Sequence, residues 1–185
     1  MKNISHQNFI TCAAGEHLVL SNLLRLNLVA GQAPINTKQL DIICLNKNKT
    51  SSSLIQVKTS MHKVRGWLLT EKVEIPVKNL FFCFIKMRKD SSENEIYVID
   101  SKTVAYAAKM CHQIYLKLPG RNGQKHNDSN LRKLYKDYKI TLGKRTLEEA
   151  SEYLTKEEIE FLEKYSEGWL NQHRDAWHLL EDFNT

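Results

Sequence analysis

A polar pair interrupts a short apolar run, 54–59 (LIQVKT), that has the composition of a β-strand. Because side chains on a strand alternate between two faces, Gln56 and Lys58 share one face, opposite to their apolar neighbours. A buried lysine costs several kcal/mol unless an anion compensates it. The run therefore predicts a polar site at Lys58 with an acidic group nearby.

Asp41 is the first candidate for that acidic group. It lies in 40–45 (LDIICL), a second apolar run of strand type. The intervening residues, 46–53, are rich in Asn, Lys, Thr and Ser, which is typical of a turn, so the two runs are expected to form a hairpin. Strand pairing would bring Asp41 within reach of Gln56 and Lys58.

Glu16 supplies a second carboxylate from a predicted helix, 6–26, whose apolar residues recur at helical spacing. Gly15 weakens this helix locally, and it would permit close packing or the close approach of a ligand.

The remaining elements predict an α/β fold with a central mixed sheet flanked by helices. Strands are expected at 79–87 and 95–99, joined as a hairpin, and a helix capped by Ser101 follows. A loop at 118–129 and a short helix at 130–138 come next. Capping boxes at Thr146 and Thr155 and an apolar pattern at 169–180 predict three further helices. We expect one domain, with a core over 1–117 and a basic loop and helical extension over 118–185 packed on it.

The combination of Glu16 on a helix, Asp41 at the start of a strand and Gln56-Val57-Lys58 on the next strand resembles the PD-(D/E)XK nuclease superfamily. Glutamine in place of the acid is similar to the QxK variant of Mrr-type restriction endonucleases. The resemblance covers roughly 16–99, and segments such as IQVKTS and GWLL look like those of uncharacterised bacterial proteins. It implies a restriction-endonuclease-like core, hydrolysis of phosphodiester bonds, most often in DNA, and a homodimer.

The resemblance also implies a role for each residue. Mg²⁺ or Mn²⁺ would be held by Asp41, by the Gln56 side-chain carbonyl, by the Val57 backbone carbonyl and by Glu16, because hard cations prefer oxygen ligands. Lys58 would orient the attacking water and stabilise negative charge on the phosphorane.

Each residue also has a plainer interpretation. Glu16 would be an exposed helix carboxylate, Asp41 would cap or pair with Lys38 or a loop amide, and Lys58 would extend its ammonium from an edge strand to solvent. Gln56 departs from the acidic pattern, which implies weaker metal affinity, a single metal ion, or a degenerate fold used only for binding.

Contacts to nucleic acid are predicted at two places, the segment that follows the 54–59 strand and the basic stretch that follows Lys117. Basic residues crowd the stretch from Lys117 to Arg145, and the chain has a net charge of +6. In the alternative interpretation, the basic side chains at both places are simply solvated and Trp67 is buried in the core. The predicted contacts are Ser60, Lys63, Arg65, Trp67, Arg121, Lys125, Arg132 and Lys133.

Composition narrows the other possibilities. No apolar run approaches the roughly 20 residues that span a bilayer, and the N-terminus is polar, so we expect a soluble, cytoplasmic protein. Four separated cysteines, with no CxxC pair, predict buried free thiols. Walker, Rossmann and G-x-S-x-G motifs are absent, and the histidines show no metal-ligand spacing.

Three functions therefore remain open. The first is a metal-dependent endonuclease. The second is a catalytically degenerate module of nuclease-like fold that binds nucleic acid or a protein partner. The third is a protein-interaction module that uses the aromatic and acidic C-terminal segment.

Overall fold

The computed structural model of the protein describes residues 3–34, 37, 39–61, 65–88, 90, 93–120 and 123–181. Lys63 and Arg121, two of the predicted nucleic-acid contacts, lie outside these ranges. No helix within them combines the length and the apolar character that a membrane crossing requires.

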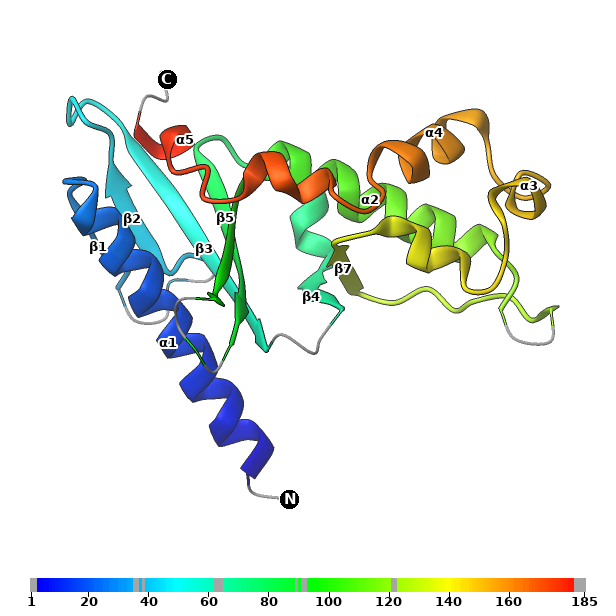
Figure 1. Ribbon diagram of the computed structural model, residues 1–185, viewed down its shortest axis with the longest axis horizontal. Helices are drawn as coiled ribbons and strands as arrows, with labels where there is room; N and C mark the ends of the chain where they lie inside the picture. The colour runs from blue at the N-terminus through cyan, green and yellow to red at the C-terminus, as the bar shows by residue number, and fades with distance from the viewer. Residues whose placement is uncertain are drawn as a thin grey trace.

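The main sheet has five strands in the order β1–β2–β3–β5–β6 (Figure 1). Neighbouring strands are antiparallel, except that β3 and β5 are parallel. The strands are β1 (Ala30–Gln32), β2 (Ile42–Leu45), β3 (Ser52–Met61), β5 (Leu80–Met87) and β6 (Glu95–Asp100). Both predicted hairpins, β2–β3 and β5–β6, are confirmed. The protein is an α/β protein with a mixed sheet flanked by helices.

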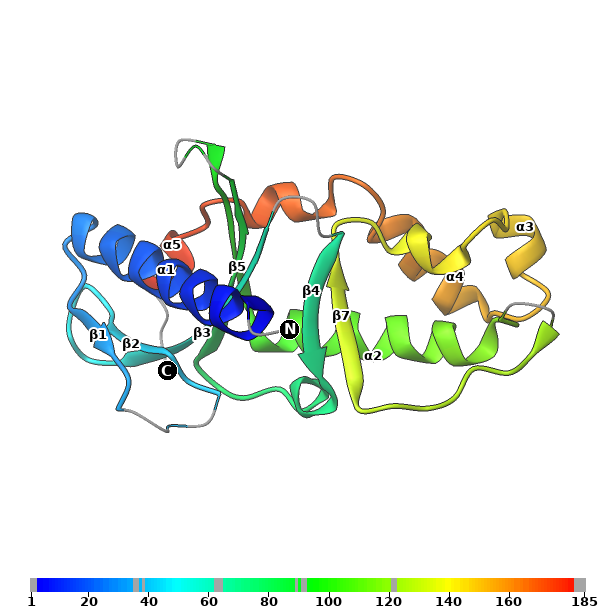
Figure 2. The ribbon, with the colours of Figure 1, turned by 90° about the horizontal axis from the view of Figure 1, so that it is seen from below.

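A second sheet contains two antiparallel strands, β4 (Gly66–Thr70) and β7 (Leu131–Tyr135). The chain crosses from β3 to β5 through β4 and the 3-10 helix η1 (Glu71–Glu74). Figure 2 shows β4 and β7 side by side, beyond the main sheet. The predicted short helix at 130–138 is wrong, because most of this segment pairs with β4 as a strand.

Helices cover both faces of the main sheet. On one face, Val57 of β3 belongs to an apolar cluster with Leu23 of α1; on the other, Phe82 of β5 clusters with Ala108 of α2. The helices are α1 (Asn3–Arg25), α2 (Ser101–Lys117), α3 (Leu147–Ala150), α4 (Lys156–Lys164) and α5 (His178–Glu181), with the 3-10 helices η4 (Tyr138–Leu142) and η5 (Trp169–His173).

Helix caps follow the predictions in part. Thr146 and Thr155 both form complete capping boxes, as predicted. The cap of α2 is Asp100 and not Ser101, because the Asp100 carboxylate accepts a hydrogen bond from the Thr103 N–H at 2.9 Å.

The predicted helix at 169–180 is interrupted between η5 and α5. The N–H of Asp175 donates to the carbonyl of Ile96 at 3.0 Å, and Arg174 forms a bridge with Tyr97. The segment therefore lies along the outer edge of β6, where its backbone is used for strand-like pairing and cannot continue a helix.

The cysteines are free thiols, as predicted, but they are not all buried. Cys44, Cys83 and Cys111 lie inside the protein, whereas Cys12 is exposed on α1. Burial raises the pKa of the Cys44 thiol to about 11, which keeps this thiol protonated and unreactive.

Helix α1 approaches β3 closely at Gly15. A Cβ atom on Gly15 would lie 1.9 Å from Thr59 Oγ1 and 3.2 Å from Ile85 Cδ1. Only glycine permits this spacing, and the contact fixes the position of the next residue, Glu16, beside β3.

The Gly15→Ala variant is expected to lower the free energy of unfolding by up to about 2 kcal/mol. Overpacking against Thr59 costs about 1–3 kcal/mol, and the better helix propensity of alanine offsets about 1 kcal/mol of it. Urea denaturation measures the change. The control is Gly31→Ala, since a Cβ atom there meets nothing within 4 Å. A Gly15→Ala protein as stable as wild type would mean that α1 moves freely over β3.

A cluster of charges surrounds Glu95 at the start of β6. Its carboxylate accepts hydrogen bonds from Lys136 Nζ, from Tyr97 Oη at 2.5 Å and from Arg88 Nη2 at 3.1 Å. Burial acts to raise the pKa of Glu95, but these hydrogen bonds and the charge of Lys136 lower it to about 2.

Lys86 lies opposite Glu95 in the β5–β6 pairing and is only 3% exposed. Its ammonium is 4.7 Å from the centre of the Trp67 ring. Burial and the nearby charge of Lys136 lower the pKa of Lys86 to about 8, and the charge of Glu95 opposes that shift.

Candidate metal-binding site

The candidate site lies where β2 begins beside β3. Asp41 immediately precedes β2, and its N–H donates to the carbonyl of Ile55 at 3.0 Å. Its carboxylate Oδ2 accepts a hydrogen bond from the N–H of Val57 at 2.7 Å. These two hydrogen bonds join Asp41 to the residues on either side of Gln56.

The Asp41–Val57 hydrogen bond has a clear structural cause. The β2–β3 pairing starts with Ile42 opposite Ile55, so β2 does not extend far enough to pair with Val57. The carboxylate of Asp41 takes the place of the missing backbone acceptor. This is the predicted alternative in which Asp41 binds an amide, although the amide belongs to β3 and not to a loop. The same contact fixes the carboxylate beside the Gln-Val-Lys run.

Gln56 and Lys58 lie on the face of β3 opposite to α1, as the alternation predicts. In the parallel pairing they are level with Phe82 and Phe84, which belong to the apolar cluster under α2. Gln56 is 7% exposed and Lys58 is half-buried. Neither side chain forms a hydrogen bond or ion pair with another residue in the described ranges.

Glu16 follows Gly15 on α1, and the Gly15–Thr59 contact holds this part of the helix against β3. Burial raises the pKa of the Glu16 carboxyl, and the negative charge of Asp41 raises it further. The positive charges of His17 and Lys58 oppose this shift. Glu16 thus lies within electrostatic range of both Asp41 and Lys58, although α1 and the Lys58 side chain start from opposite faces of β3.

The donor set suits a hard divalent cation. It consists of two carboxylates and one amide carbonyl, all of them oxygen donors. The raised pKa of Glu16 reflects repulsion from Asp41 in addition to burial, and a cation would relieve this repulsion. Across the described ranges no three His, Cys, Asp or Glu side chains are grouped to hold a metal. Among the described residues, Gln56 and the backbone carbonyl of Val57 are the candidates for a third protein donor beside Asp41 and Glu16.

The predicted nucleic-acid contacts fall into two groups. Arg65, Lys125 and Lys133 are exposed and available to a ligand. Ser60 is half-buried, and its Oγ is buried without a hydrogen bond to any described residue.

Trp67 and Arg132 are both largely buried and form internal contacts. Trp67 is 2% exposed and donates its indole N–H to the carbonyl of Ile85 at 2.9 Å, so no base can stack on it. Arg132 is 8% exposed; its guanidinium is paired with Glu74 and donates to the carbonyl of Ser129 at 2.6 Å. Trp67 is therefore the core residue of the alternative interpretation, and its predicted contact is wrong. Arg132 is held by internal contacts at the lining of a groove, and its contact with nucleic acid stays a prediction.

Comparison with known proteins finds no matching protein-family model and no matching curated protein.

Proposed function

We propose that this protein is a divalent-metal-dependent endonuclease of restriction-endonuclease-like fold that hydrolyses phosphodiester bonds, most often in DNA. The supporting observation is the hydrogen bond from Val57 N–H to Asp41 Oδ2, which holds a carboxylate beside the Gln56-Val57-Lys58 run. A second supporting observation is that the charges of Asp41 and Lys58 both shift the pKa of Glu16.

In this proposal Asp41, Gln56, Glu16 and the Val57 carbonyl would hold Mg²⁺ or Mn²⁺. A cation held there would supply positive charge beside the scissile phosphate and a more acidic bound water. Lys58 donates hydrogen bonds from Nζ to the attacking water and to a non-bridging phosphate oxygen, which stabilises the charge that develops during attack. The hydrogen bond from Val57 N–H keeps the Asp41 carboxylate in one orientation.

A plasmid cleavage assay tests the proposal. Purified protein is incubated with supercoiled plasmid in Mg²⁺, in Mn²⁺, in Ca²⁺ and in EDTA. Conversion to nicked or linear DNA in Mg²⁺ or Mn²⁺, and none in EDTA, is the expected result. Salt-sensitive DNA binding without turnover in any metal would contradict it, and would support the non-catalytic module instead.

The non-catalytic module is favoured by one observation. Gln56 occupies the position where a third carboxylate would strengthen metal binding, and only Asp41 and Glu16 remain as acids. Lys58 is half-buried and forms no ion pair with another described residue. This favours the proposal of an enzyme, because a purely structural site gains nothing from a half-buried cation without an anionic partner.

Two further parts of the proposal follow from the activity. Cutting both strands of a duplex is commonly done by two copies of one chain, so we propose a homodimer, which light scattering would detect. We also propose that the protein works in the cytoplasm, where reducing conditions would keep Cys44, Cys83 and Cys111 as thiols.

The Gln56→Glu variant is expected to bind Mn²⁺ about tenfold more tightly than wild type, because ligand charge tunes the affinity of such sites. Without metal, repulsion among three carboxylates should lower its melting temperature. Isothermal titration and thermal melts with and without Mn²⁺ measure the two effects. Gln113→Glu, at an exposed position of α2, is the control. If neither variant differs from wild type with Mn²⁺, Gln56 does not face a metal.

A further inference from the structure

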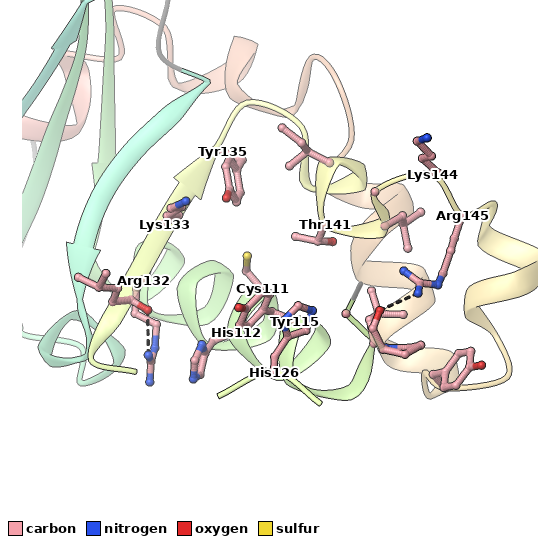
Figure 3. A pocket seen from close by; sticks show the side chains of 18 of the residues that line it. Cys111, His112, Tyr115, His126, Arg132, Lys133, Tyr135, Thr141, Lys144 and Arg145 are labelled. Carbon is pink, nitrogen blue, oxygen red and sulfur yellow. Dashed lines mark hydrogen bonds between the residues drawn. The ribbon is translucent and has the colours of Figure 1, made fainter. Parts of the chain in front are cut away.

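A groove of about 1030 Å³ lies between α2, the loop that follows it, β7 and η4 (Figure 3). It is separated from α1 and β2 by the β4–β7 sheet (Figure 1). Glu16, Asp41, Gln56 and Lys58 are not among the residues that line it. The groove is therefore a separate feature from the candidate metal site.

Tyr115 on α2 and His126 on the loop that follows α2 form a stacked pair of aromatic rings in the wall of the groove. The Tyr115 and His126 ring centres are 3.9 Å apart, and the ring planes are 24° apart. Tyr115 is 40% exposed. His112 Nε2 and Asp128 Oδ1, 2.7 Å apart, fasten the same loop to α2. These contacts hold Tyr115 beside His126, and Tyr115 keeps part of its surface exposed, with the centre of the His112 ring 6.3 Å from its own.

The lining also carries cations that the protein does not neutralise. Lys133 and Lys144 are exposed, and within the described ranges neither forms an ion pair. The Arg145 guanidinium lines the groove and donates to the carbonyl of Pro119 at 2.6 Å, which leaves its charge uncompensated.

Carboxylates in the lining do not balance these cations. The lining has two carboxylates, Glu152 and Glu149, of which Glu149 also accepts a hydrogen bond from Thr146 N–H at 2.8 Å as the cap of α3, against the three cations Lys133, Lys144 and Arg145. A fixed aromatic surface beside unpaired cations matches a nucleobase joined to phosphates.

We propose that this groove binds single-stranded nucleic acid, with an unpaired base stacked on the Tyr115–His126 pair and phosphates near Lys133. A paired base within a duplex does not expose its face, so this geometry selects an unpaired segment. The inference rests on the proposed function only in naming its substrate class: DNA with a single-stranded arm. Binding itself needs neither metal nor cleavage.

Fluorescence anisotropy with a labelled thymidine homopolymer of about 15 nucleotides tests the groove, since single-strand sites span roughly 4–16 nucleotides. The assay is run in EDTA, so that cleavage does not contribute. Tyr115→Leu is expected to weaken binding about tenfold, and Tyr115→Phe to bind like wild type, because the ring is retained. Lys133→Glu should weaken binding and reduce its salt dependence.

Matched controls are available on the same protein. Tyr106 is also on α2 and also 40% exposed, but it does not line the groove, so Tyr106→Leu should bind like wild type. Lys156→Glu makes the same charge change on α4, outside the groove. Circular dichroism melts verify that each variant is folded.

The outcomes separate the two proposals. Failure of wild-type protein to bind the homopolymer at low salt, or equal effects of the groove variants and their controls, would overturn the groove. Binding that depends on Tyr115, in a protein that cleaves no plasmid in any metal, would retain the groove and reject the nuclease.

Discussion

The Lys58→Ala variant is expected to cleave plasmid DNA at least about a hundredfold more slowly than wild type, the effect typical of removing a group that stabilises transition-state charge. Single-turnover rates at saturating Mg²⁺ measure the loss. Because Lys58 forms no ion pair with another described residue, its removal should leave the free energy of unfolding nearly unchanged. An unchanged cleavage rate would remove Lys58 from the mechanism.

Two other variants distinguish a loss of cleavage activity from a loss of folding stability. Lys102→Ala removes an exposed cation from α2 and should cleave like wild type. Asp41→Asn keeps an oxygen that can accept from Val57 N–H but removes the charge. It should fold normally, lose metal-dependent activity and lower the pKa of Glu16, because the repulsion from Asp41 is gone. If this variant retained activity, Asp41 would have only a structural role.

The Glu95→Gln variant is expected to lower the free energy of unfolding by about 3 kcal/mol at neutral pH. The change leaves Lys136, Arg88 and the buried Lys86 without their shared anion. Chemical denaturation measures it. Glu160→Gln is the control, because Glu160 pairs with Lys156 on an exposed face of α4 and should contribute less than about 1 kcal/mol.

The Glu95 effect should also depend on pH in one direction. The pKa of Glu95 falls from an ordinary 4.5 to about 2 on folding, so its charge stabilises the protein fully above pH 4.5. That contribution is lost as the pH falls from 4.5 toward 2. The stability difference between wild type and Glu95→Gln should therefore shrink over this interval. A constant difference would mean that the carboxylate charge is not its cause.

Local patterns predicted much of the fold. Apolar runs separated by turn residues were sufficient to predict the β2–β3 and β5–β6 hairpins. The capping-box spacing at Thr146 and Thr155 predicted where α3 and α4 begin. The β4–β7 sheet was missed because its strands are far apart in sequence and because Arg132 points inward. The partner that makes this burial possible, Glu74, belongs to a different element. No local pattern reveals such a pair.

The candidate site was predictable as a set of residues but not as a geometry. Spacing alone suggested that Asp41 would lie near Gln56. The hydrogen bond to Val57 N–H depends on where β2 begins, and the position of Glu16 depends on the Gly15–Thr59 contact. The groove was missed because Tyr115 and His126 are ordinary residues until the loop after α2 folds back and stacks them.

The order in which the strands are synthesised matters for the second sheet. A ribosome completes β4 long before β7, so β4 leaves the exit tunnel with an unpaired edge, and Trp67 and Leu69 are not yet covered. Exposed strand edges invite pairing with neighbouring nascent chains. A fragment that stops after α2 would lack β7 and leave this edge of β4 without its partner strand, so we expect such a fragment to aggregate more readily than the full chain.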